Sequence, residues 1–291
     1  MKTQSANTTM SWLWKIPLIA GTYFIATTVS GGMIMAMGMQ FPDFPGQTYS
    51  PIRSFVAALV LGAAVYLLAR GISGSTAFRF FSIFAFTYVS FCVNNQLEGA
   101  IFTTMGGHDT MLVFFVIPCA AIAAAAVALV KPPEINGVLT TVFSGSSIST
   151  WWWRAAIAWL SFPVIYYIFG MLIYPFVAHG YEGGELGLVV PSQGVILGVV
   201  SIRSLLFLIV AVPILTNWSR SRRTLFVALA AAFTAMVGVV GLIEVNWIPM
   251  TLRIVHGLEI SADSIVHAWV LVALLVPKPK TELAELESSN K

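Results

Sequence analysis

Eight long apolar runs are the feature that most restricts what this chain can fold into. They cover approximately residues 16–38, 55–68, 80–102, 111–130, 155–177, 189–215, 225–243 and 260–276. A helix needs about 20 apolar residues to cross the roughly 30 Å hydrocarbon layer of a bilayer. Only 9% of the 291 residues are charged, against roughly 25% in an ordinary soluble domain. We therefore predict an all-α integral membrane protein with about eight transmembrane helices.

The distribution of basic residues predicts the orientation of these spans. With a cytoplasmic N-terminus, all but three of the 15 Lys and Arg lie on the cytoplasmic side, the exceptions being Arg53, Arg203 and Arg253. Cytoplasmic loops of membrane proteins carry such an excess. We expect both termini in the cytoplasm and the chain in the plasma (inner) membrane, with the lipid bilayer as its partner. The basic residues form no stripe, so nucleic-acid binding is not expected.

Short motifs recur in the same order in both halves of the chain. Trp-Leu-Trp-Lys at residues 12–15 recurs as Trp-Trp-Trp-Arg at 151–154, and Ile-Arg-Ser at 52–54 recurs at 202–204. A duplicated four-helix unit has an even number of spans, so both copies would keep the same orientation around a pseudo-twofold axis along the membrane normal. A ligand site would then lie between the two parallel repeats.

This interpretation divides the chain into four parts. They are a first four-helix repeat (1–133), a cytoplasmic linker (134–150), a second four-helix repeat (151–277) and a cytoplasmic tail (278–291).

Each half also brings one arginine and one glutamate to a similar depth near the outer boundary. These residues are Arg53 and Glu98 in the first half, and Arg203 and Glu244 in the second. Charged side chains within spans cost about 2.5–3.5 kcal/mol each and usually face the bundle interior or a water-filled cavity. One interpretation is an Arg–Glu ion pair in each half that fixes helix register. The other is that the same groups line a polar cavity open to the outside.

The last apolar run contains a stripe of ionisable residues. On a helix starting near Pro249 they are spaced 3, 3, 4 and 4 apart, which places them within an arc of about 120°. Exposure to acyl chains would be costly, so this face is expected to turn into the bundle. The stripe consists of Arg253, His256, Glu259, Asp263 and His267.

Three interpretations of the stripe stay open. His267 lies roughly 14 Å from the inner end of the last span, and it is either a neutral imidazole satisfied by a neighbour or one member of a proton relay with Asp263, since the reference pKa of histidine is near 6.5. Alternatively, His256, Glu259 and Asp263 hold a divalent metal, because His-x-x-Glu is half of a known bundle metal site. The other half is missing, so no cofactor is predicted and metal is the lesser alternative.

Pro191 and Gly194 interrupt the start of the sixth run. We expect a broken or re-entrant start here, which is tolerated only where backbone faces protein or water.

Two functions follow from these features. The first is a small secondary transporter or solute-binding protein for an unidentified solute. Its outward-facing cavity would be lined by Arg53, Glu98, Arg203, Glu244 and the stripe. The second is an intramembrane enzyme acting on a lipid or isoprenoid-like substrate, by acid/base or metal-assisted chemistry. Its acid and base would be among Glu98, Glu244, His256 and Asp263. Walker, Rossmann and Gly-x-Ser-x-Gly signatures are absent from the sequence, so nucleotide-driven transport and serine-hydrolase chemistry have no support.

Overall fold

The described part of the chain is mostly helical and contains no strand. The computed structural model describes residues 11–43, 46–104, 108–133, 148–182 and 186–277. Within these ranges, eight helices are long and apolar enough to cross a membrane, which confirms the predicted all-α multi-pass fold. The elements, in chain order, are α2 (Trp12–Ala36), α3 (Pro51–Ala69), α4 (Thr76–Thr87), η1 (Tyr88–Val93), α5 (Asn94–Phe102), α6 (Asp109–Leu129), α7 (Ile148–Glu182), α8 (Gln193–Thr216), α9 (Arg222–Phe233), η2 (Thr234–Val239), α10 (Val240–Glu244) and α11 (Met250–Leu275).

The third and seventh spans each contain a π-helical segment. The π-helix η1 joins α4 to α5, and η2 joins α9 to α10. π-Helical turns are rare and are often found at functional sites. Neither segment was predicted.

Two helices extend well beyond their apolar runs. The helix α7 runs over 148–182 rather than 155–177, and α11 begins at Met250, ten residues before its apolar run but next to Pro249, where the helix was expected to start. The first part of α11 carries Arg253, His256 and Glu259, which lower the local hydropathy although they belong to a regular helix. The length of an apolar run therefore underestimates the length of a helix whose polar face is turned inward.

Serine side chains mark the starts of three helices. The hydroxyl oxygens of Ser50, Ser75 and Ser221 each accept a hydrogen bond from the backbone N–H three residues later. These bonds satisfy amides that have no partner inside the helix. Pro51 follows the first of these caps, in the first turn of α3, where its missing N–H costs nothing.

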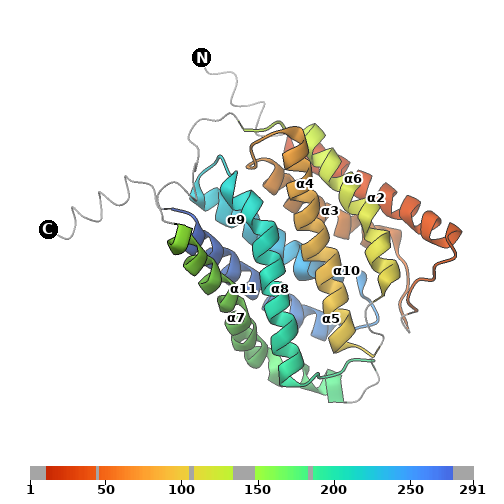
Figure 1. The fold of residues 1–291 in the computed structure, drawn as a ribbon. Coiled ribbons are helices and arrows are strands. Elements are labelled where there is room, and N and C mark those ends of the chain that lie inside the picture. Colours follow the sequence, from red (N-terminus) through yellow and green to blue (C-terminus); the bar gives the residue numbers. More distant parts are fainter. Residues whose placement is uncertain (1–10, 44–45, 105–107, 134–147, 183–185, 278–291) are drawn as a thin grey trace.

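The helices form one bundle, with α2 and α6 on one flank and α7 and α11 on the other (Figure 1). The helix α2 packs against α3 and α6 on one side, and α7 packs against α8 and α11 on the other. Between them, α3 contacts α9 and α4 contacts α8. The two halves of the chain therefore meet along their second and third spans.

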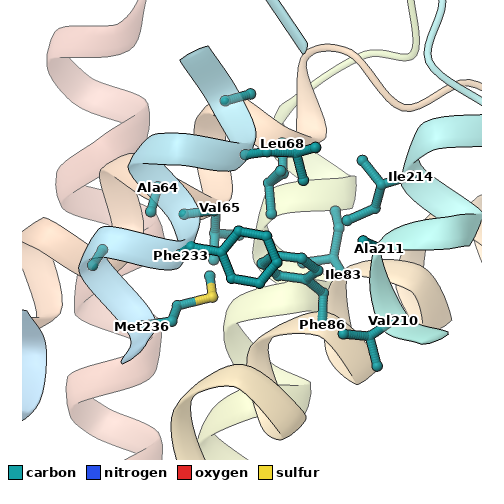
Figure 2. Close-up of a cluster of buried hydrophobic side chains, with 14 of the residues drawn as sticks. Ala64, Val65, Leu68, Ile83, Phe86, Val210, Ala211, Ile214, Phe233 and Met236 are labelled. Atoms are coloured by element: carbon teal, nitrogen blue, oxygen red, sulfur yellow. The ribbon is translucent and has the colours of Figure 1, made fainter. Parts of the chain in front are cut away.

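The core lies where these inner helices meet. Figure 2 shows Phe86 of α4 packed against Phe233 of α9, with ring centroids 4.9 Å apart. Both rings are almost fully buried. The surrounding side chains come from α3, α4, α8 and η2, and they are Ala64, Val65, Leu68, Ile83, Val210, Ala211, Ile214 and Met236.

We call the end of the bundle with the turns around Arg70 and Arg220 the basic end. The opposite end carries Glu98 and Glu244, and we call it the acidic end. At the basic end the α3–α4 and α8–α9 turns pair through their backbones. Ile72 and Trp218 form an isolated antiparallel bridge. The adjacent backbone hydrogen bonds are reciprocal: residue 73 donates to residue 217, and residue 219 donates to residue 71.

Two arginines bind helix carbonyls at the basic end. Arg79 is 2% exposed and donates hydrogen bonds to the carbonyl oxygens of Ala69, Ile72 and Val130. Arg222 donates to carbonyl oxygens in the last turn of α11. Carbonyls at helix C-termini lack partners within the helix, so these side chains act as C-caps for α3, α6 and α11.

At the acidic end, the predicted broken start of the sixth span is confirmed, whereas the re-entrant alternative is wrong. Residues 189–192 of this apolar run are not helical, and α8 is continuous from Gln193. Leu188 forms an isolated bridge with Thr103, and Val189 donates a hydrogen bond to the carbonyl oxygen of Phe102. Pro191, which has no N–H to donate, thus lies in a loop that pairs with the end of α5.

Two of the predicted parts fall mostly outside the described residues. Residues 134–147 of the linker and the whole tail, 278–291, lie outside them. The remaining linker residues, 148–150, are helical and open α7.

Candidate functional site

A cavity of about 460 Å³ occupies the acidic half of the bundle. It extends from loop residues such as His108, Leu188 and Trp247 down to His267. Its walls come from η1, α5, α6, α7, α8, α9, η2, α10 and α11, whereas no residue of α2 or α3 lines it. Cavities of roughly 300–1,000 Å³ accommodate small-molecule ligands. Most of the lining therefore comes from the second half of the chain, and the first half adds mainly the end of its third span and the start of its fourth, so the cavity is not symmetric between the two halves.

Arg203 is the central charged group of this cavity. It is 3% exposed and its Nη2 lies 2.6 Å from Oε1 of Glu98, while its Nε donates a 2.7 Å hydrogen bond to Oδ1 of Asn94. The guanidinium also lies 5.7–5.9 Å from the ring centroids of Phe162, Tyr166 and Phe207. Such cation–π contacts strengthen when the cation is desolvated. Glu98 remains 28% exposed, so the ion pair can be reached from the cavity mouth.

The predicted ion pair within each half is wrong, because the pair that forms crosses between halves. Arg203 reaches Glu98 since α8 packs against η1 and α5. Arg53 instead donates to the carbonyl oxygen of Thr48, and Glu244 accepts a 3.0 Å hydrogen bond from Ser54. These latter groups lie at the rim of the bundle and join the α2–α3 loop to the end of α10.

The polar stripe on α11 faces the bundle. The helix is continuous, and Glu259, Asp263 and His267 are 8%, 5% and 1% exposed. The opposite face carries exposed apolar side chains, among them Ile265 and Trp269. The rise of 1.5 Å per residue places His256 about 16 Å above His267 along the helix axis. The four residues from His256 to His267 thus form a ladder through the depth of the cavity.

The upper part of this ladder is hydrogen-bonded. The Tyr181 hydroxyl lies 3.4 Å from Nε2 of His256, and Nδ1 of His256 lies 3.1 Å from Oε2 of Glu259. A Cβ added at Gly170 of α7 would be 3.5 Å from the other oxygen of Glu259, an ordinary contact distance, so this carboxylate lies against α7. Tyrosine, imidazole and carboxylate in sequence can pass a proton between them.

The lower part of the ladder ends in polar atoms that no described residue hydrogen-bonds. Oδ1 of Asp263 and both ring nitrogens of His267 are buried without a hydrogen-bond partner among the described residues. Phe162, Phe207 and Phe233 surround the imidazole, with centroids 4.8, 6.3 and 5.5 Å from its own. A buried polar group without a partner costs about 1–3 kcal/mol. A water molecule or a polar group of a ligand would remove this cost.

Arg253 lies at the top of the stripe and does not join the ladder. Its Nη1 donates a 3.3 Å hydrogen bond to the carbonyl oxygen of Leu242 near the end of α10. Like Arg53, it binds backbone and holds the rim of the cavity.

The structure also locates the suggested metal ligands. His256 and Glu259 are in contact, but neither is hydrogen-bonded to Asp263. Among the residues described, no group of three or more His, Cys, Asp and Glu side chains is arranged to hold a metal ion.

The sequence interpretation missed the aromatic part of the site. Tyr166 and Tyr181 on α7 line the cavity beside the charged groups. Tyr181 lies outside the predicted span, because the apolar run ends near residue 177 whereas α7 continues to Glu182. Its position next to His256 depends on the extra turn of α7.

Comparison with protein-family models, with curated proteins and with solved structures found no match for this chain.

Proposed function

We propose that the protein is a small secondary transporter or solute-binding protein whose cavity takes a small, partly apolar cation. The observation that carries this proposal is the buried pair Asp263 and His267 at the closed end of the cavity. Oδ1 of Asp263 and both ring nitrogens of His267 have no hydrogen-bond partner in the described ranges. Groups left without protein partners in a ligand-sized cavity are suited to bind a ligand's polar atoms.

The composition of the cavity lining supports a cationic solute. Four carboxylates line it, namely Glu98, Glu244, Glu259 and Asp263, against the single arginine Arg203. The lining also contains nine aromatic side chains. Aromatic faces attract cations, most strongly when water is excluded. An organic cation would use both features, with the aromatic rings around it and the Asp263 carboxylate as its counter-charge.

Proton coupling is proposed for the same ladder. Successive groups from Glu259 to Asp263 and from Asp263 to His267 are about 6 Å apart along the helix axis, a gap that one bridging water spans. Ionisable chains of this kind serve as proton relays in transporters. In this proposal, proton binding at Asp263 releases the cation.

The packing below His267 is consistent with one state of an alternating-access cycle. The ring of Phe233 belongs both to the cage around His267 and to the core cluster of Figure 2. Apolar packing therefore separates the cavity from the basic end. Transport would require a second conformation in which these inner helices part.

Binding can be tested on the purified full-length protein with three named probes. We expect choline and tetraphenylphosphonium to raise its melting temperature, and glutamate to leave it unchanged. Asp263→Asn should fold but lose the cation response. The matched control Asp43→Asn changes an exposed acid at the same end of the bundle and should keep it. Stabilisation by glutamate alone, or an unchanged cation response in Asp263→Asn, would refute the cationic site.

A specific observation favours a second function, that of an intramembrane enzyme. The chain Tyr181, His256 and Glu259 provides a general base whose orientation is fixed by a carboxylate. A lipid or isoprenoid-like substrate would enter the cavity from the membrane. Incubation of the protein in lipid vesicles, followed by mass spectrometry of the lipids, tests this. A chemical change that depends on the protein and is lost in His256→Gln would favour the enzyme over the transporter.

We further propose that residues 1–133 and 151–277 are parallel repeats. Both halves have helices of the same order, and α4 and α9 begin 146 positions apart (76 and 222), as do η1 and η2 (88 and 234). Glu98 and Glu244 share this spacing, and so do the bridged residues Ile72 and Trp218. Arg53 and Arg203 are 150 apart, so this alignment shifts them by one helical turn.

The proposed topology places both termini in the cytoplasm and the acidic end outside, in the plasma (inner) membrane. It rests on the distribution of basic residues. A reporter that is active only outside the cytoplasm, fused after Lys291, should be inactive. Its activity would overturn the orientation.

A further inference from the structure

We propose that the basic end carries a binding site for the phosphate headgroup of an anionic membrane lipid, formed between the end of α3 and the start of α9. The site is a second cavity of about 400 Å³, separate from the cavity that contains Arg203. Its lining residues are Leu67, Arg70, Trp218, Arg220, Arg223, Thr224, Val227 and Ala228.

Three arginines converge on this cavity without a carboxylate. Arg70, Arg220 and Arg223 are exposed, and in the described residues none of them forms an ion pair. Partial burial and the nearby charge of Arg70 both lower the pKa of Arg220 below its usual value. Like charges this close repel each other, and an anion bound between them would remove that repulsion.

Two of the guanidinium groups are held in place by the protein. Arg220 donates a 2.7 Å hydrogen bond from Nε to the carbonyl oxygen of Arg70, which leaves its two terminal nitrogens for a ligand. Arg70 lies 5.6 Å from the ring centroid of Tyr66. Guanidinium groups oriented in this way match the geometry of phosphate oxygens.

The floor and walls of the cavity are apolar. Trp218, which is 1% exposed, forms the floor, and its indole N–H is engaged with the carbonyl oxygen of Ser221 and the hydroxyl of Thr224. Leu67 and the exposed Val227 continue this surface along α3 and α9 toward the middle of the membrane.

The depth of the cavity fits a lipid headgroup. The spans Pro51–Ala69 and Arg222–Glu244 respectively end and begin at this level. Val227 lies about 7 Å along α9 from Arg222. The arginines thus lie at the polar boundary and the apolar wall lies within the hydrocarbon. Basic pockets between helices at the cytoplasmic face of membrane proteins bind anionic headgroups. A free phosphate would use the same arginines but would leave the apolar wall unused.

Native mass spectrometry of the full-length protein tests this site with dioleoyl phosphatidylglycerol, dioleoyl phosphatidylcholine and inorganic phosphate as probes. We expect phosphatidylglycerol to bind at least tenfold more tightly than phosphatidylcholine. One basic residue near a membrane surface contributes about fivefold to the binding of anionic lipid. Arg70→Gln/Arg223→Gln should therefore weaken phosphatidylglycerol binding by about 25-fold and leave phosphatidylcholine binding unchanged.

The matched control is Arg154→Gln. It removes a basic residue in the first turns of α7, at the same end of the bundle but outside the cavity, and should change phosphatidylglycerol binding less than twofold. If the double variant does not fold, Arg223→Gln alone replaces it, because Arg223 makes no hydrogen bond or ion pair within the described residues; the expected loss is then about fivefold.

Three results would overturn the proposal. The first is equal binding of the two phospholipids. The second is a loss of phosphatidylglycerol binding in Arg154→Gln as large as in the Arg70→Gln/Arg223→Gln variant. The third is displacement of phosphatidylglycerol by inorganic phosphate at similar concentrations, which would make free phosphate the ligand.

Discussion

Replacing Arg203 by leucine should lower the free energy of unfolding by about 3–5 kcal/mol, the usual cost of breaking a buried ion pair. The bonds to Glu98 and Asn94 are both made by a charged donor, and each such bond contributes about 1.5–3 kcal/mol. Leucine recovers part of the lost free energy by packing against the rings of Phe162 and Phe207, which already border the guanidinium. Leucine also leaves Glu98 without its cation.

The pairwise part of this energy can be isolated with a double-mutant cycle. Glu98→Gln alone should cost about 1–2 kcal/mol, because the carboxylate is 28% exposed and partly screened by solvent. The double variant should cost about 1.5–3 kcal/mol less than the sum of the two single variants.

Reversible unfolding in mixed detergent micelles, followed by circular dichroism, measures these differences. The matched control combines Arg203→Leu with Asp43→Asn, an exposed acid in the α2–α3 loop. Energies of this control pair should add within about 0.3–0.5 kcal/mol. A coupling below about 0.5 kcal/mol for the Arg203 and Glu98 pair would mean that the ion pair does not stabilise the cavity, and the reasoning would fail.

Three further substitutions should change stability in a thermal unfolding assay. Gly71→Ala should destabilise strongly, because the new Cβ would lie 2.1 Å from the Trp218 ring; Gly21→Ala, with no atom within 4 Å, is its control and should be neutral or slightly stabilising. Arg79→Met should cost about 3–5 kcal/mol, since three buried carbonyl oxygens lose their donor. Ser221→Ala removes a helix cap and should cost about 1 kcal/mol. Losses below about 1 kcal/mol for the first two variants would contradict the packing described.

The number of spans could be predicted because the length of an apolar run is set directly by the thickness of the bilayer. The inward orientation of the α11 stripe followed from the same physics, since Asp263 and His267 cannot face acyl chains without a large cost. For both inferences, the spacing of residues along a single helix is sufficient, and no contact between helices has to be known.

The partner of Arg203 could not be predicted in this way. Its contact with Glu98 depends on how α8 is rotated about its axis relative to α5. The π-helix η1 alters that rotation by interrupting the regular α-helical repeat just before Asn94. Nothing in the sequence Tyr-Val-Ser-Phe-Cys-Val announces this segment, because it contains neither proline nor glycine. The cavity residue Tyr181 was missed for a simpler reason, namely that α7 continues beyond its apolar run.

The pairing between the α3–α4 and α8–α9 turns has an evolutionary consequence. Residues 71–73 and 217–219 are joined by two backbone hydrogen bonds, to which the hydroxyls of Ser73 and Ser219 add bonds to the same carbonyl oxygens. The backbone bonds do not depend on residue type, because main-chain groups are the same in every residue except proline. Most side chains in these turns can therefore change without loss of the junction, with Gly71 as the exception because Trp218 lies against it. The sequences of the two halves can therefore diverge by substitution during evolution while the two turns stay joined.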